Sequence, residues 1–221
     1  MATTTRAVWY SINNALDLLF DRGALLYVQT VALGVTTVSW HPYREEPFLK
    51  ADDSTIAQYL RWLAAGQYSA MLADGSLLQI AYTVEGGKIT RHRLNYVPCP
   101  VAIDPDVTND EPIGDLVEVL VACEPLDSVL LRSSVRFDYD AASAKVGHPA
   151  SHLTMNGSDC RIACVAPVHP HRFLAFVFQH FYPALYGQEL AWFTDAGTTT
   201  IDTRSLTEED RQTIHLNWPL S

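Results

Sequence analysis

A group of cationic and imidazole side chains lies between residues 132 and 161. The segment reads RSSVRFDYDAASAKVGHPASHLTMNGSDCR and holds three arginines, three aspartates and two histidines four residues apart. Arginine and histidine are the side chains that hold a phosphate or a developing negative charge. Their presence in a chain with a formal net charge of −10 predicts a local anion site.

These residue types match what metal-free cleavage of a phosphodiester requires. One histidine removes a proton from a 2′-hydroxyl, another protonates the leaving oxygen, and arginine offsets the charge on the phosphorus. We therefore assign proton transfer to His148 and His152, orientation of an imidazole to Asp138, and phosphate binding to Arg136 and Arg161.

A second cationic segment, KITRHRL at 88–94, holds three basic residues and no acid. Arg91 and Arg93 are predicted to bind phosphate. Contact with nucleic acid and exposure on an edge strand explain His92 equally well. Tyr96 could stack on a base, although a tyrosine on a strand is more often part of a core.

Two other interpretations of the first group stay open. Arg136 and Asp138 could form a structural salt bridge while His152 bonds to the backbone. Alternatively, His148, His152 and Asp138 could bind a metal ion. On a strand, however, residues four apart are separated by roughly 13 Å at about 3.3 Å per residue, so no metal is expected unless a turn forms at 147–150.

The remaining cysteines and histidines are assigned structural places. Cys160 and Cys164 are expected to face the core as small hydrophobic residues. His169 and His171 flank Pro170 and are expected to cap a helix at the surface. His180, on an apolar helix, is expected to be buried and hydrogen-bonded.

The composition indicates an ordinary globular protein. The chain has 221 residues, of which 48% are hydrophobic and 18% charged, which suits one domain. A pI near 5.1 argues against an extended basic groove for duplex DNA.

The sequence contains no run of 18 apolar residues, no leader pattern and no cysteine framework, so we expect a bacterial-type cytoplasmic protein with reduced thiols. The nucleotide-binding G-x-G-x-x-G and Walker motifs and the G-x-S-x-G and H-E-x-x-H motifs are absent, and no cofactor is expected.

Periodicity predicts a single α+β domain with a mainly antiparallel sheet and flanking helices. Its parts are an N-terminal helix and strands (1–66), a central sheet with the cationic group (67–165) and C-terminal helices (166–221). Apolar spacing predicts a helix over 5–20 with a buried stripe of Val8, Ile12, Ala15, Leu16 and Leu19. Further helices are predicted over 55–65, 113–122 and 170–182 and from 207. Strands are predicted within 24–40 and over 68–72, 76–84, 89–97, 129–140, 152–156 and 160–165, with a turn at 156–159 and an acidic loop at 101–112.

Strand alternation predicts which side chains share a face. In VRFDYD, Val135, Phe137 and Tyr139 point one way and Arg136, Asp138 and Asp140 the other. If the strands at 135–140, 152–156 and 160–165 are neighbours, their polar side chains form one face opposite the core. This face would carry Arg136, Asp138, His152, Thr154 and Arg161, with His148 reaching it from the Gly147–Pro149 turn.

Over roughly 90–183 the chain resembles a bacterial family of unknown function. The segments that carry this resemblance are HRLNYVPCP, VRFDYD, GHPASHLTMNG, CRIACVAPVHPHRF and FVFQHFYP. That family has an R-x-D strand, an H-P-x-S-H-L motif and a closing aromatic helix. The order R-x-D, H-P, H is also similar to that of ribonuclease-type toxins of toxin–antitoxin pairs. This resemblance implies roles for Arg136, Asp138, His148 and His152. Thr154 stands where the last histidine of the toxins' H-x-H would fall.

The sequence thus favours a protein that acts on nucleic acid (RNA or single-stranded DNA) in bacterial defence or a toxin system. Cleavage would be independent of metal, and an antitoxin or another protein partner is expected. The alternative is a non-catalytic accessory subunit that docks on a larger defence or nucleic-acid-processing partner. The acidic composition favours that alternative. No membrane association is expected.

Overall fold

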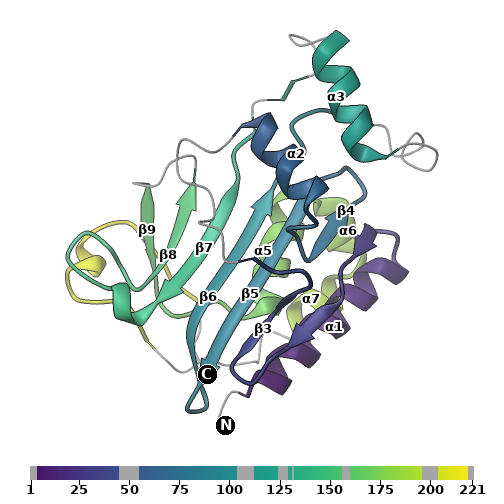
Figure 1. Cartoon of the computed structure of the whole chain (residues 1–221). Coiled ribbons are helices and arrows are strands. Elements are labelled where there is room, and N and C mark those ends of the chain that lie inside the picture. Colours follow the sequence, from purple (N-terminus) through teal and green to yellow (C-terminus); the bar gives the residue numbers. More distant parts are fainter. Residues whose placement is uncertain are drawn as a thin grey trace.

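The fold is α+β, with one large sheet and helices packed on it (Figure 1). A computed structural model describes residues 4–44, 55–103, 112–123, 129–130, 132–155, 160–195 and 204–218. The strands are β1 (Leu25–Val28), β2 (Val31–Leu33), β3 (Thr37–Trp40), β4 (Ala70–Leu72), β5 (Leu77–Glu85), β6 (Lys88–Val97), β7 (Val135–Asp140), β8 (Ser151–Met155), β9 (Arg161–Cys164) and β10 (His215–Leu216). The helices are α1 (Thr5–Asp21), α2 (Ile56–Ala64), α3 (Ile113–Cys123), α5 (Pro170–Phe181), α6 (Pro183–Gln188) and α7 (Leu190–Asp195), with 3-10 turns at Ala141–Ser143 and Asp210–Gln212.

The strands follow the order β1-β4-β5-β6-β7-β8-β9-β10, and β3 adds to β5 and carries β2. Every pair is antiparallel except β9 with β10. The predicted mainly antiparallel sheet is therefore confirmed. The strands at 135–140, 152–156 and 160–165 are neighbours, as the common polar face requires, because β8 lies between β7 and β9.

One face of the sheet is covered by α1 and α5. The buried residues of α1 are the predicted stripe of Val8, Ile12, Ala15, Leu16 and Leu19, and the Thr4 hydroxyl caps the helix by accepting from the Ala7 N–H. From α5, Phe173, Leu174, Val177 and Phe178 are buried in the same core. The face under these helices is therefore the apolar side of the sheet. The side chains of the strands that point away from α1 and α5 form the second face.

The second face changes in character along the strands. At one end Leu77 and Val97 pack with residues of α2 and α3 in a separate apolar cluster. Two residues further along lie the buried amides of Gln79 and Asn95, and beyond them the charged side chains of β6 and β7. The apolar cluster thus closes one end of this face, and the polar side chains occupy the remainder.

His92 is part of the apolar side rather than a surface contact. It is 1% exposed and lies between Tyr82 and Tyr139 on the neighbouring strands. The Val168 N–H donates to its Nε2 at 2.8 Å. Both expectations for His92, nucleic-acid contact and an exposed edge, are therefore wrong, because strand alternation directs it to the face opposite Arg91 and Arg93. Tyr96 shares that apolar face and is 3% exposed.

Several smaller predictions are corrected. Cys164 is buried, but Cys160 is exposed because it precedes the first paired residue of β9. His169 caps α5 as predicted, with its Nδ1 accepting from the His171 N–H, yet His171 is 4% exposed and not at the surface. His180 is exposed, outside the buried stripe of α5.

The segment predicted as a strand over 129–140 forms a strand only from Val135, although Val129 bridges Val101. The predicted turn at 156–159 and most of the acidic loop lie outside the described residues. The expected short helix from 207 is a turn followed by the 3-10 helix Asp210–Gln212.

Burial of neutral histidines makes stability depend on pH. Burial lowers the pKa of His92 to about 4 and that of His171 to about 4. The unfolded chain binds these protons near pH 6.5, so the stabilisation is complete above that pH and is lost as the pH falls toward 4. We expect each histidine to remove about 1 kcal/mol from the free energy of unfolding between pH 6.5 and pH 5.5.

Urea unfolding at pH 7 and pH 5.5 measures this effect. In His92→Gln the difference between the two pH values is expected to shrink, because one of the buried neutral histidines is gone. An equal free energy of unfolding at both pH values in the unaltered protein would contradict the prediction.

Candidate functional site

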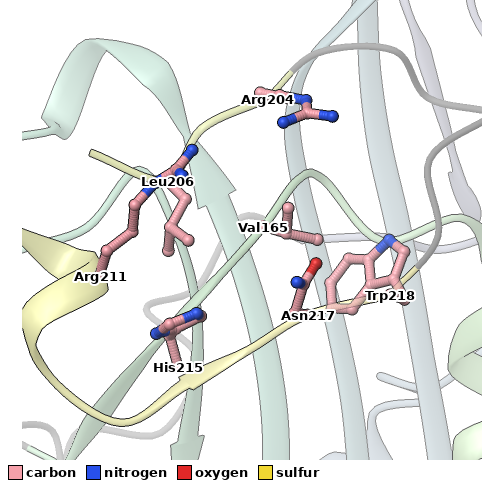
Figure 2. Close-up of a pocket in the computed structure, with 7 residues that line it drawn as sticks. All are labelled: Val165, Arg204, Leu206, Arg211, His215, Asn217 and Trp218. Atoms are coloured by element: carbon pink, nitrogen blue, oxygen red, sulfur yellow. The ribbon is translucent and has the colours of Figure 1, made fainter. Parts of the chain in front are cut away.

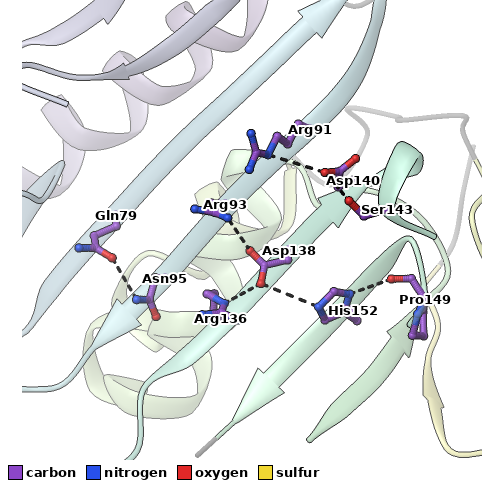
Figure 3. Close-up of polar contacts among 10 residues, drawn as sticks. All are labelled: Gln79, Arg91, Arg93, Asn95, Arg136, Asp138, Asp140, Ser143, Pro149 and His152. Atoms are coloured by element: carbon purple, nitrogen blue, oxygen red, sulfur yellow. Dashed lines mark hydrogen bonds and ion pairs between the residues drawn. The ribbon is translucent and has the colours of Figure 1, made fainter. Parts of the chain in front are cut away.

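The polar side chains of the second face are arranged in three cross-strand rows (Figure 3). The first row runs Gln79, Asn95, Arg136, Thr154 and Arg161; the second runs Arg93, Asp138 and His152; the third pairs Arg91 with Asp140. Directly opposite residues in antiparallel strands are about 4.5–5.5 Å apart. The backbone therefore brings together all the predicted site residues except His148, which lies just before β8. We call these rows the arginine face.

Asp138 is the centre of the ionic contacts. The Nε–H of Arg136 donates to its Oδ2 at 2.6 Å, and Nε of Arg93 lies 3.9 Å from Oδ1. The side chains of Arg136 and Asp138 are only 13% and 17% exposed. A partly buried, charge-assisted bond of this kind holds both groups in one orientation. The Arg136–Asp138 salt bridge of the alternative structural interpretation is thus present, and Asp138 is shared with a second arginine.

His152 is buried beside Asp138 and is 4% exposed. Its Nδ1 lies 2.8 Å from the carbonyl oxygen of Pro149. Because a carbonyl only accepts, Nδ1 carries the proton, and burial lowers the pKa of the ring despite the opposing effect of Asp138. His152 is therefore neutral at pH 7, and its Nε2, 3.9 Å from Asp138 Oδ2, carries no proton.

His148 reaches the arginine face from a tight turn. Gly147 has a φ of +73°, which favours glycine, and Lys145 and His148 exchange two backbone hydrogen bonds. The ring centroids of His148 and His152 are 5.0 Å apart at an interplanar angle of 75°. The two rings are thus in edge-to-face contact with each other.

Arg91 and Asp140 form the more exposed end of the face. Their closest charged atoms are 4.0 Å apart, and the side chains are 39% and 35% exposed. Asp140 also accepts from the Ser143 hydroxyl and the Ala142 N–H. Four arginines stand against two aspartates on these rows, a difference of +2 in a chain of net charge −10.

Some buried polar atoms of the first row make no hydrogen bond to the described residues. Two of them, Asn95 Oδ1 and Thr154 Oγ1, belong to residues that are 0% and 7% exposed. The Asn95 amide nitrogen donates to Gln79, whose own amide donates to the Gln67 carbonyl. An unsatisfied buried polar atom costs stability, so such atoms often serve a ligand.

A cavity of about 180 Å³ adjoins Arg91 and Arg93. Its lining includes the hydroxyl-bearing residues Thr37, Ser39, Tyr43 and Thr83. This cavity could not be predicted from the sequence, because residues 37–43 reach it only through the pairing of β3 with β5. Asn95 could have been predicted, because alternation along β6 places it with Arg91 and Arg93, whereas Gln79 joins it through the pairing of β5 with β6.

We predict that the Thr154 hydroxyl does not stabilise the fold. Because Oγ1 makes no hydrogen bond to the described residues, Thr154→Val is expected to keep or raise the free energy of unfolding, by up to about 1 kcal/mol. Ser151 on the same strand is the matched control, since its buried hydroxyl donates to the Ala166 carbonyl at 2.7 Å. Ser151→Ala is expected to cost about 1 kcal/mol. Urea unfolding of both variants decides this, and an equal loss in Thr154→Val would show that its hydroxyl is structural.

Among the described residues, no group of three or more histidine, cysteine, aspartate or glutamate side chains is arranged to hold a metal ion. Within the same residues, every helix is too short or too polar to cross a membrane.

Comparison with known proteins gives a match to a protein family. A search of the curated proteins finds none, and a search of the solved structures finds none. The model of an uncharacterised conserved protein family, DUF2290, matches residues 26–218, which include the whole arginine face. The predicted membership in a family of unknown function is confirmed at that level, and the chain belongs to the DUF2290 family.

Proposed function

We propose that the protein binds the phosphate backbone of single-stranded nucleic acid, RNA or DNA, on the arginine face. The observation that carries this proposal is the buried Thr154 hydroxyl, which makes no hydrogen bond to the described residues and lies in register between Arg136 and Arg161. A hydroxyl at a strand position between two arginines is suited to a phosphate, whose oxygens accept from hydroxyl and guanidinium groups.

The neighbouring rows extend this site along the strands. Arg91 and Arg93 are two residues apart on β6, so their side chains leave the same face about 6.8 Å from each other. Tyr43, in the adjoining cavity, offers an aromatic ring on which a base could stack. Side chains that hold phosphates beside an aromatic ring are typical of proteins that bind single strands.

The charge of the chain favours a single strand over a duplex. Binding to duplex DNA depends on many lysine and arginine contacts to phosphate. The arginine face offers four arginines, and the chain as a whole has a net charge of −10. A short cationic face in an acidic protein suits a few phosphates of one strand.

Metal-independent cleavage of RNA is the second candidate. The observation that favours it is the pair formed by His148 and His152, 5.0 Å apart beside the Arg136–Asp138 bond, with a neutral ring available as a base. A phosphate cannot lie between two rings in contact, so His148 would have to move for the pair to act on opposite sides of it. Binding without cleavage therefore has the stronger support.

A titration of labelled single-stranded RNA and DNA in EDTA tests the proposal. The affinity is followed by anisotropy at several salt concentrations, and the same samples are run on a gel. We expect binding that weakens as salt rises, with the strands intact. Cleavage by the unaltered protein and not by His152→Ala would establish the second candidate. Absence of binding to either strand would overturn both and favour the accessory subunit that docks on a larger partner.

A further inference from the structure

The C-terminal segment 204–218 is attached to the edge of the sheet. The strand β10 pairs with β9, and the Val165 N–H donates to the Leu216 carbonyl at 2.9 Å. The Ser205 N–H donates to the Val165 carbonyl at 2.9 Å. Thr207 and Asp210 exchange side-chain and backbone hydrogen bonds in a capping arrangement. In Figure 1 this yellow segment lies beyond β9.

A cavity of about 680 Å³ lies between this segment and the end of β9 (Figure 2). This volume is within the range of small-molecule sites, about 300–1,000 Å³. Part of its lining is apolar, from Val165, Leu206 and the indole of Trp218. The polar part consists of Arg204, Arg211, His215 and Asn217.

The described part of the cavity lining is cationic. Its described lining contains two arginines and no carboxylate. Glu208 lies 3.7 Å from Arg211, but its side chain is 89% exposed, so this ion pair is weak. Arg204 forms no ion pair with a described residue. A ligand that carries negative charge is therefore favoured.

Trp218 is held in place from one side. The guanidinium carbon of Arg172 lies over the indole, 5.4 Å from the ring centroid, a cation–π contact. The indole also borders the cavity, where a flat aromatic group can stack on it. The adjacent Asn217 amide has both a donor and an acceptor and can pair with the polar edge of such a group.

We propose that this pocket binds a nucleoside phosphate, with the base on Trp218, its edge at Asn217 and the phosphate at Arg204 and Arg211. One ligand of this chemistry is a free mononucleotide, and another is the phosphorylated end of a strand. The inference does not depend on the proposed function, because its residues are separate from those of the arginine face.

Calorimetric titration of the full chain with the four 5′-mononucleotides tests the pocket. The four corresponding nucleosides and orthophosphate serve as partial ligands. We expect at least one mononucleotide to bind at least tenfold more tightly than its nucleoside and than orthophosphate. Arg204→Gln and Trp218→Leu should each weaken this binding at least tenfold, while Trp218→Phe, which keeps a ring, should weaken it less. Arg6→Gln, an exposed arginine of α1, is the control and should leave it unchanged.

The double variant Arg91→Gln/Arg93→Gln separates this pocket from the arginine face, because it should bind the mononucleotide normally. In that variant we compare a 5′-phosphorylated strand with the same strand that carries a 5′-hydroxyl and with the mononucleotide. If the phosphorylated strand binds more tightly than both, the ligand is a strand end. Equal binding of the two strands would identify the free mononucleotide. Absence of mononucleotide binding, or equal binding in Arg204→Gln, would overturn the inference. Arg204 is exposed, so that variant should fold even if Trp218→Leu does not.

Discussion

Replacing Arg91 and Arg93 together with glutamine is expected to weaken binding to single-stranded RNA by about 100-fold. Each guanidinium is expected to make a charge-assisted hydrogen bond to phosphate, worth about 1.5 kcal/mol or more, and every 1.4 kcal/mol is tenfold in affinity. The fold should be retained, because Asp138 keeps its bond to Arg136. The dependence of affinity on salt should also become less steep, because fewer counterions are released.

The matched control for this variant is the pair Arg6→Gln and Lys88→Gln. Both side chains are exposed, and neither belongs to the three rows. The control lowers the net charge by the same amount as the test variant. Similar losses in the two double variants would mean that only overall charge matters, and the arginine face would then not be the binding site.

Replacing Asp138 with alanine is expected to lower the free energy of unfolding by about 2–3 kcal/mol. Removal of one partner from a buried ion pair costs about 3–5 kcal/mol, and the 17% exposure of Asp138 reduces that cost. The loss arises because Arg136, 13% exposed, keeps its charge without the carboxylate. Chemical denaturation of both proteins at pH 7 measures the difference.

Asp138→Asn is the graded control, since its amide oxygen can still accept from Arg136. We expect it to cost less than the alanine variant. If both variants were as stable as the unaltered protein, the ionic contacts around Asp138 would have no structural role. Asp138 would then be important only through its contact with a ligand or with His152.

Much of the arginine face could be predicted because a strand has a period of two. Once VRFDYD is taken as a strand, Arg136 and Asp138 must share a face, and the same holds for Arg91 and Arg93 on KITRHRL. The apolar stripe of α1 was predicted for the same reason, from a period of 3.6. Local spacing therefore determined which side chains point together within each element.

Other features depend on pairing between distant segments, which local spacing does not determine. The position of Tyr43 beside Arg93 follows from the pairing of β3 with β5. The pocket around Trp218 requires the parallel pairing of β10 with β9, from residues about 50 apart in sequence. The prediction for His92 was wrong for a different reason. It followed from the charges of Arg91 and Arg93, whereas strand alternation places His92 on the opposite, buried face.

The most direct test of the arginine face is an NMR titration that follows the arginine Nε–H signals as single-stranded RNA is added. The signals are assigned from single arginine-to-glutamine variants. We predict that those of Arg91, Arg93, Arg136 and Arg161 shift together and saturate at one RNA equivalent, while that of Arg6 does not move. Binding of RNA with these four signals unchanged would contradict the account.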